Sequence, residues 1–317
     1  MSFLQRIAYF PASFFGMIMG LTGLGIALFK GMEQMPIWLG VYLGVVAGLM
    51  GLLLMMYGFK LLRYFNEVKA EMRHPIKMNF VPAISISFLL MSIVAWDLGW
   101  HSVSSNLWMI GAAAHFALTY WVLYHWVHHD HFTLEHSNPA WFIPIVGNII
   151  VPLAGVHHAH ADINMLFFAT GFVFWVVLKA ILVNRIIFHT PMQQRLIPTL
   201  FIFIAPPAVG FLSYLALNGG ELDLFARVLY FFALVMTILM AVSVGKFVRL
   251  EFALSWWAFT FPLAAMAIAS FKYAELSQLS LYHTFGWGVT LLLAAMVSLF
   301  LWRTVQAAYH KKICVDH

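Results

Sequence analysis

Long runs of apolar residues dominate this sequence, and short polar segments separate them. Each run holds about 20 residues, the length that an α-helix needs to cross the hydrocarbon core of a bilayer. The pattern predicts an all-α membrane protein with ten spans, forming one transmembrane domain over residues 1–317. The predicted spans are 9–29, 36–59, 78–96, 104–127, 139–156, 164–184, 198–217, 222–244, 252–271 and 281–302.

The composition points in the same direction. Hydrophobic residues make up 63% of the chain and charged residues only 9%, whereas a soluble domain carries roughly 25% charged residues. Lipid is therefore the natural solvent for most of the surface. The first apolar run, from about Tyr9 to Lys30, is too long for the core of a signal peptide, and we interpret it as a span. A disulfide within one chain is excluded because Cys314 is the only cysteine.

The net charge of +5 first suggests a nucleic-acid partner, but the placement of Lys and Arg excludes that interpretation. With ten spans, 14 basic residues fall on the side of the termini and three on the other side. Basic residues stay in the cytoplasm. The split therefore predicts a multi-pass protein of the cell membrane, such as a bacterial inner membrane, with both termini cytoplasmic. The three residues on the other side are Lys30, Arg227 and Lys272.

Prolines recur once per helical hairpin and form an internal repeat. A proline inside a helix removes a backbone hydrogen bond and bends the axis, so it marks a special environment in a membrane. We therefore expect the proline-bearing helices to be kinked and central, around a pore, and the others to be straight and peripheral. The prolines of the repeat, all in odd-numbered spans, are Pro11, Pro82, Pro144, Pro206 with Pro207, and Pro262.

Carboxylates are absent from the middle of every predicted span. Cation sites and proton-coupled pumps need such groups, so the inventory favours a passive anion pathway without a cofactor. The positive ends of broken helices and neutral polar groups can hold an anion weakly enough for rapid release. His115, the one titratable residue near a span centre, is interpreted as a hydrogen-bonded structural residue. The candidate pore-lining groups are Ser13, Ser85, Ser87, Asn148 and Thr260.

Two further segments have simple structural interpretations. Gly40, Gly44 and Gly48 form a ladder of small residues that lets helices approach closely, and we expect it to pack within the chain. The charged stretch 60–77 is expected to extend the second span into a solvated cytoplasmic loop.

A histidine-rich segment supports an enzyme as an alternative function. The motif HxxHH at residues 125–129 resembles part of the histidine boxes of membrane di-iron hydroxylases and desaturases. Such a site needs about eight converging histidines, and the predicted topology places this cluster and the one at residues 157–160 on opposite sides. We therefore expect no enzyme. Adventitious or regulatory binding of metal or protons and a plain solvated loop remain open for His125, His128, His129 and His131.

Four segments of the chain resemble the family of the tellurite-resistance protein TehA and the plant guard-cell slow anion channel. They are FPASFFGMIMGLTGLG, NPAWFIPIVGN, APPAVGFLSYLA and SWWAFTFPLAA. The Phe-Pro segment near the start and the WAFTFP segment are the most specific, and the resemblance extends over nearly the whole chain.

The resemblance implies five helical hairpins in a quasi-five-fold arrangement around a central pore. It also implies a homotrimer with one pore in each protomer, and a pore-blocking phenylalanine that maps onto Phe261. We therefore expect a passive channel for small anions such as chloride or nitrate, gated by this phenylalanine. Other family members are described as transporters of dicarboxylate, sulfite or tellurite-type oxyanions, so a secondary transporter or exporter of organic or inorganic anions remains the alternative.

Overall fold

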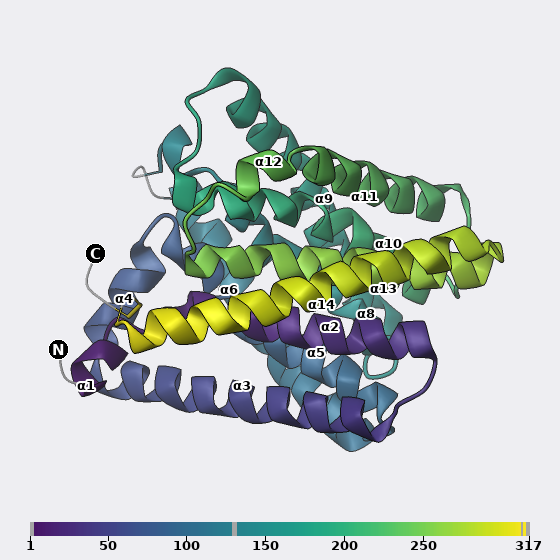
Figure 1. Ribbon diagram of the computed structural model, residues 1–317, viewed down its shortest axis with the longest axis horizontal. Coiled ribbons are helices and arrows are strands. Elements are labelled where there is room, and N and C mark those ends of the chain that lie inside the picture. The colour runs from purple at the N-terminus through teal and green to yellow at the C-terminus, as the bar shows by residue number, and fades with distance from the viewer. Residues whose placement is uncertain (1–2, 129–131, 312, 315–317) are drawn as a thin grey trace.

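The computed structural model describes residues 3–128, 132–311 and 313–314, and within these ranges the chain is helical without a β-strand. Figure 1 shows the long helices running side by side, with α1 and the end of α14 at the same end of the molecule. The α-helices are α1 (Phe3–Ile7), α2 (Phe15–Met32), α3 (Ile37–Arg63), α4 (Phe65–Arg73), α5 (Ala83–Asp97), α6 (His101–His128), α7 (Ile143–Ile150), α8 (Pro152–Gly155), α9 (Ala161–Phe188), α10 (Ala205–Leu217), α11 (Leu224–Val242), α12 (Val244–Phe247), α13 (Thr260–Ser277) and α14 (Ser280–Tyr309). The 3₁₀ helices are η1 (Ala12–Phe14), η2 (Lys77–Phe80), η3 (Leu134–His136), η4 (Pro139–Phe142), η5 (Gln194–Phe203) and η6 (Leu254–Phe259).

Nine helical segments of the described chain are long and apolar enough to cross a membrane. Each overlaps one of the predicted apolar runs, and the largest difference is at the last one, where α14 continues to Tyr309 instead of ending at residue 302. The remaining run forms a shorter apolar segment, Pro139–Gly155. It is divided into η4, α7 and α8, and Pro144 and Pro152 lie in the first turn of α7 and of α8.

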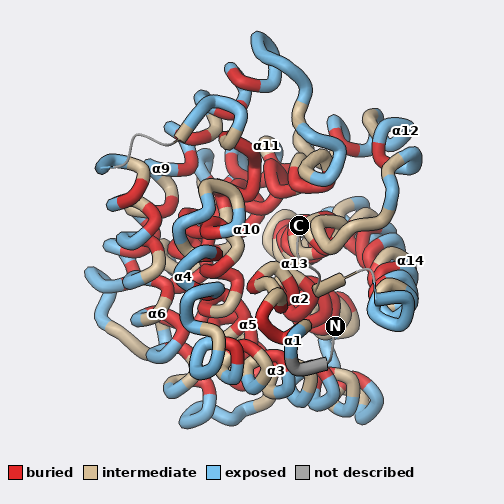
Figure 2. The backbone as a smooth tube through the Cα atoms, turned by 90° about the vertical axis from the view of Figure 1, so that its left-hand side faces the viewer, coloured by how far each residue is buried: buried red, intermediate tan, exposed pale blue. Residues whose placement is uncertain are grey.

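The long helices fall into two classes by burial. In α2, α5, α10 and α13, with their 3₁₀ starts, 67% to 78% of the apolar window is buried inside the protein, against 28% to 33% in α3, α6, α9, α11 and α14. Figure 2 shows the buried backbone gathered in the interior and the exposed backbone around it. The proline-bearing segments are therefore the central ones, as the repeat predicts.

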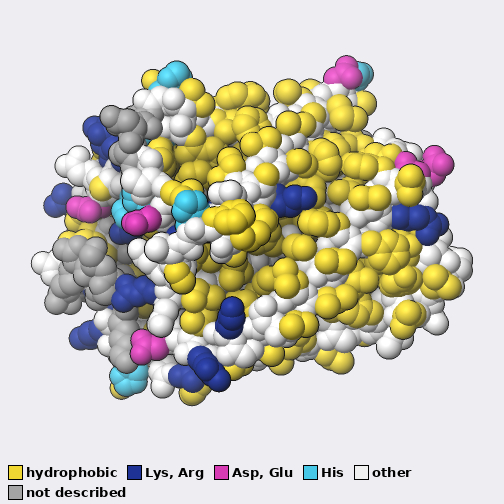
Figure 3. All heavy atoms as spheres, turned by 90° about the horizontal axis from the view of Figure 1, so that it is seen from above, with side chains coloured by type: hydrophobic (Ala, Val, Ile, Leu, Met, Phe, Trp, Pro, Cys, Tyr) yellow, Lys and Arg dark blue, Asp and Glu magenta, His cyan; other side chains and the backbone are white. Residues whose placement is uncertain are grey.

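Contacts between the inner segments close a ring. The helix α2 contacts α5, α5 contacts α7, α7 contacts α10, α10 contacts α13, and α13 contacts α2. An outer helix packs behind each member of the ring, and the sequence-adjacent pairs are α2 with α3, α5 with α6, α7 with α9, α10 with α11, and α13 with α14. Each outer helix exposes large apolar side chains. On the face shown in Figure 3, apolar side chains cover the middle and most of the charged side chains lie nearer the two ends.

The prolines lie in a different place from the one expected. Pro144, Pro206 and Pro262 occupy the first turn of α7, α10 and α13, directly after a 3₁₀ helix, and Pro82 immediately precedes α5. The first turn of an α-helix has no intrahelical acceptor for these N–H groups, so proline costs no bond there. The inner segments are therefore not α-helices kinked in the middle; each changes from 3₁₀ to α near its proline.

The glycine ladder also differs from the expectation. A Cβ atom built on Gly40, Gly44 or Gly48 would meet no other atom within 4 Å. The ladder therefore lies on the outward surface of α3 and does not pack against another helix of the described chain.

Candidate functional site

A large cavity, which we call the vestibule, opens at the end of the molecule away from α1. Its volume is about 1080 Å³. All five inner segments contribute to its wall, through residues of α2, α5, α8, α10 and α13. The wall carries charges as well as apolar side chains. Its charged and histidine members are Lys30, Glu33, Asp97, His157, Lys272, Glu275 and His283.

A second, much smaller space, which we call the narrow cavity, lies within the same ring, nearer the 3₁₀ starts of the inner segments. Its volume is about 50 Å³, and all five inner segments line it as well, through η1 and α2, η2 and α5, α7, η5 and α10, and η6 and α13. Its wall is almost entirely apolar, and among the lining residues only Ser13 and Ser255 carry a hydroxyl. The narrow cavity is therefore an apolar constriction, while the vestibule is wide and has charged side chains in a mostly apolar wall.

Phe261 is the residue that belongs to both walls. It is half-buried and follows Thr260 at the start of α13. A Cβ atom on Gly23 would lie 3.8 Å from the Phe261 ring and would overlap Ala264. The helix α2 thus approaches α13 closely beside this ring, which only a glycine permits.

Of the other candidates from the sequence, Ser13 and Pro262 line the narrow cavity. The remaining polar candidates are buried, and among the described residues none of them lines either space. The side chain of each donates a hydrogen bond to a backbone carbonyl instead, at 2.7–2.9 Å. The acceptors are Pro82 for Ser85, Ala83 for Ser87, Pro144 for Asn148 and Trp257 for Thr260. The other prolines of the repeat are not among the residues that line either space: Pro11, Pro82, Pro144, Pro206 and Pro207.

His115 forms part of a buried polar cluster between α5, α6 and α7. Its Nε2 lies 3.0 Å from the carbonyl oxygen of Pro144, and its Nδ1 lies 2.9 Å from the hydroxyl of Ser85. The hydroxyl of Thr119 donates to the same carbonyl at 2.9 Å. A side chain on Gly147 would collide with the His115 ring. The cluster fixes the start of α7, and His115 has the hydrogen-bonded structural role that the sequence suggests.

Two ion pairs lie at the vestibule, one partly buried and one exposed. The ammonium of Lys30 on α2 is 2.9 Å from Asp97 Oδ1 on α5, and Lys272 pairs with Glu275 on α13 at 2.7 Å. The Lys30 side chain is 39% exposed, so water screens the first pair. The lysine side chains of the two pairs are 39% and 37% exposed and are therefore accessible to a diffusing ion.

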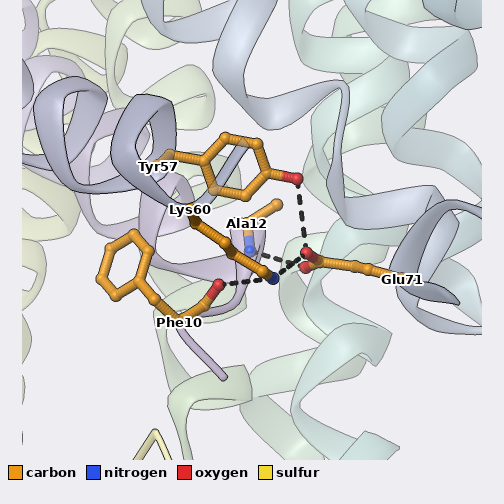
Figure 4. A network of polar contacts seen from close by, with 5 residues as sticks. All are labelled: Phe10, Ala12, Tyr57, Lys60 and Glu71. Atoms are coloured by element: carbon orange, nitrogen blue, oxygen red, sulfur yellow. Dashed lines mark hydrogen bonds and ion pairs between the residues drawn. The ribbon is translucent and has the colours of Figure 1, made fainter. Parts of the chain in front are cut away.

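A buried ion pair at the opposite end was missed by the sequence analysis (Figure 4). The Lys60 ammonium lies 2.6 Å from Glu71 Oε2 and also donates to the carbonyl oxygen of Phe10 at 2.9 Å. Glu71 Oε1 accepts from the N–H of Ala12 at 2.8 Å, and the hydroxyl of Tyr57 donates to Oε2 at 3.3 Å. The segment 60–77 is thus not a simple solvated loop, because α4 buries Glu71 and ties the backbone on both sides of Pro11.

The residue pattern of α4 indicates that Glu71 is buried and needs a partner. In Phe65–Arg73 the buried positions are Val68 and Glu71, three residues apart and so on one face of the helix. A carboxylate on the apolar face of an amphipathic helix calls for a cationic partner. Sequence alone does not say which of the nearby basic residues supplies it.

The histidine box does not assemble a metal site in the described residues. His125 Nδ1 lies 2.8 Å from the carbonyl of Trp121, and the ring of His128 packs against Tyr124 at 4.6 Å. His129 and His131 lie outside the described residues. Within the described part of the chain, no group of three His, Cys, Asp or Glu side chains is arranged to hold a metal ion.

Comparison with known proteins then decides the family. The model of the SLAC1 family, voltage-dependent anion channels, matches residues 9–305. The chain belongs to this family. The SLAC1 match includes all five inner segments and every residue that lines the two cavities.

Individual relatives agree with the family. An uncharacterized transporter of Methanocaldococcus jannaschii, MJ0576, is 26% identical over 99% of this chain and 98% of its own length. The S-type anion channel SLAH2 of Arabidopsis thaliana is 32% identical over 69% of this chain and 42% of its own. A tellurite resistance protein TehA homolog of Haemophilus influenzae is 26% identical over 81% of this chain and 79% of its own. The chain is thus a SLAC1-family protein of anion transport across membranes.

Proposed function

We propose that this SLAC1-family chain is a passive channel for small anions, such as chloride or nitrate, in the cytoplasmic membrane. The observation that carries the proposal is the position of Phe261, which lines both the wide, charge-bearing vestibule and the narrow apolar cavity. All five inner segments line both spaces, so the line joining them runs along the axis of the ring.

Phe261 is proposed as the gate. An uncharged ring in an apolar constriction excludes ions by its size and by keeping water out. The narrow cavity below it offers an anion no fixed counter-charge, so an ion that passes the ring is not trapped. Phe261 follows the 3₁₀ helix η6 and lies beside Gly23, so its backbone is held by close packing while the ring can change its rotamer.

The architecture that we propose has ten spans in five hairpins, arranged around the pore with quasi-five-fold symmetry. The broken segment Pro139–Gly155 would then be the fifth span, shortened because it is surrounded by protein and not by lipid. The charge split supports cytoplasmic termini, and reporter fusions after Trp126 and after Tyr309 should both report cytoplasm. A homotrimer is proposed as well, and the outward glycine ladder of α3 is a surface on which another helix could pack closely.

The test is anion flux through purified protein in liposomes. We expect Phe261→Ala to raise chloride conductance by more than about tenfold, Phe261→Leu to give a smaller rise, and Phe261→Trp to stay closed, because the block depends on size. Phe259→Leu is the control, because that ring packs at 4.5 Å against Phe201 behind the pore wall. If wild type and Phe261→Ala had equal conductance, and both eluted as folded protein in size-exclusion chromatography, Phe261 would not be the gate.

A secondary transporter of oxyanions or dicarboxylates is the second candidate, supported by relatives that are named as transporters or for tellurite resistance. The same liposomes separate the two. A channel current reverses at the equilibrium potential of the anion, and a coupled carrier shifts that potential when a proton gradient is imposed.

A further inference from the structure

The fixed charges of the vestibule have the wrong sign for an anion pathway. Two lysines and three carboxylates line it among the described residues, so with neutral histidines its wall carries one excess negative charge. A negative mouth lowers the local concentration of anions. The wall also holds His157 and His283, and protonation of both would reverse the sign of its charge.

His157 belongs to a cluster of imidazoles around one indole. Its ring stacks on Trp96 with centroids 3.9 Å apart and planes 7° apart. His101 lies 4.3 Å and His158 5.4 Å from the same indole. These residues come from the end of α5, the start of α6 and the turn after α8, so the cluster joins three elements at the rim of the vestibule.

The surroundings of the cluster contain both signs of charge. Asp97, next to Trp96, bonds Lys30 through Oδ1, whereas its Oδ2 is buried and has no hydrogen-bond partner. An imidazolium at His157 would give this carboxylate a second cationic neighbour and leave more of the Lys30 charge for a passing ion. His158 Nε2 lies 2.8 Å from the Ser104 hydroxyl.

Several other titratable or charged groups lie at this end. Glu221 and Asp223 follow the wall residues Gly219 and Gly220, and Asp223 accepts from the Tyr214 hydroxyl. Arg227 on α11 donates to the hydroxyl of Tyr273 on α13 at 3.0 Å.

On α13, Lys272 and Glu275 form their own pair at 2.7 Å. On α14, His283 packs edge-on against Phe271, with ring centroids 5.4 Å apart. Glu33 follows α2. His160 pairs with Asp162 at 3.3 Å and is absent from the residues that line the vestibule.

We propose that the vestibule is a capture site for small inorganic anions that forms when His157 and His283 are protonated, so that acid on this side increases anion conduction. The inference rests on the proposed channel function. Protonation changes the excess charge of the wall from one negative to one positive. Two unit charges about 8 Å from the ion, in water, change its local concentration about fivefold.

The direction of the pKa shifts sets the pH range. Partial burial lowers the pKa of His157, repulsion from His101 lowers it further, and Asp97 opposes both. Burial and the neighbouring His157 and His101 lower the pKa of His158. Because the pKa of His157 is lowered from the ordinary histidine value of 6.5, its charge forms mainly below that value, and the part of the conduction that depends on His157 should rise as the pH falls below it.

Single-channel recording of Phe261→Ala in planar bilayers tests the proposal, with the pH lowered from 7.5 to 5 on each side in turn at low salt. We expect about a fivefold increase in chloride current when the vestibule side is acidified, and none from the other side. The double variant His157→Gln/His283→Gln should lose most of the increase. His160→Gln, at the same end but outside the wall, should keep it. His157→Arg should carry an elevated current already at pH 7.5.

Three results would overturn the proposal. An acid response that survives intact in His157→Gln/His283→Gln, or that comes only from the other side, contradicts the proton-dependent capture site and leaves the channel function standing. An unchanged current at pH 7.5 in His157→Arg contradicts the electrostatic mechanism. Absence of current at every pH in folded Phe261→Ala overturns the channel function and this inference together.

Discussion

The two cavities are lined by the same five segments yet differ in almost every physical property. The vestibule holds about 1080 Å³ and seven charged or histidine side chains, whereas the narrow cavity holds about 50 Å³ and no ionisable group among its lining residues. In a wide aqueous space a unit charge is screened, and in a narrow apolar space it is not. We therefore expect the narrow cavity to exclude ions and the vestibule to adjust the local concentration of anions gradually.

The comparison predicts that one added charge has very different effects in the two spaces. In the Phe261→Ala background, Ser13→Asp places a carboxylate in the narrow cavity, where an effective dielectric constant near 20 makes repulsion worth at least about a hundredfold in anion conductance. Ala216→Asp places the same group in the vestibule wall, where the loss should be about two- to threefold. Chloride currents in liposomes or planar bilayers would measure both effects.

The neutral variant Ser13→Asn is the matched control, because it has nearly the size of Ser13→Asp without the charge. Its current should stay within about threefold of the parent. If Ser13→Asp and Ala216→Asp reduced the current equally, the pathway would not pass through the narrow cavity.

The two ends of the protein should also differ in how much their ion pairs stabilise the fold. Glu71→Gln leaves the Lys60 ammonium, whose side chain is 3% exposed, without its carboxylate, and this should cost about 3–5 kcal/mol in the free energy of unfolding. Asp97→Asn breaks the half-exposed pair with Lys30 and should cost less than about 1 kcal/mol. Unfolding in mixed micelles of increasing denaturing detergent measures both.

The double variant Lys60→Met/Glu71→Leu separates charge from packing. Removal of both charges should recover much of the stability lost in Glu71→Gln, because no uncompensated ion then stays buried. Equal losses in Glu71→Gln and Asp97→Asn would contradict the difference between the two ends.

Much of the fold follows from the sequence because lipid imposes a simple rule on helix length and hydrophobicity. The apolar runs and the proline repeat predict the long helices and their division into central and peripheral ones, which burial bears out. The 3₁₀ starts were not predictable, because a proline in a membrane segment is equally compatible with a kink in mid-helix and with the first turn of a new helix.

The site was less predictable than the fold. Hydroxyls such as Ser85 and Thr260 were expected in the pore, but a hydroxyl in a helix can equally donate to a carbonyl of its own turn, and the sequence does not distinguish the two. The pairs Lys30–Asp97 and Lys60–Glu71 join residues 67 and 11 positions apart, and only the packing of the helices selects these partners. The residue types thus indicate which kinds of interaction are available, whereas the tertiary contacts determine which side chains face the pathway.

The smallest expected effect tests screening in the vestibule alone. In the Phe261→Ala background, Lys30→Gln adds one unit to the excess negative charge of the wall. At about 20 mM salt this should lower the chloride current about twofold, because one charge about 8 Å from the ion is only weakly screened there. At about 1 M salt the Debye length shrinks to roughly 3 Å, and the difference from the parent should vanish. Lys69→Gln, an exposed charge on α4 at the other end, should leave the current unchanged at both concentrations. A deficit in Lys30→Gln that persists at high salt would mean that Lys30 contacts the ion directly, and the vestibule would then be a binding site of fixed geometry and not a diffuse electrostatic one.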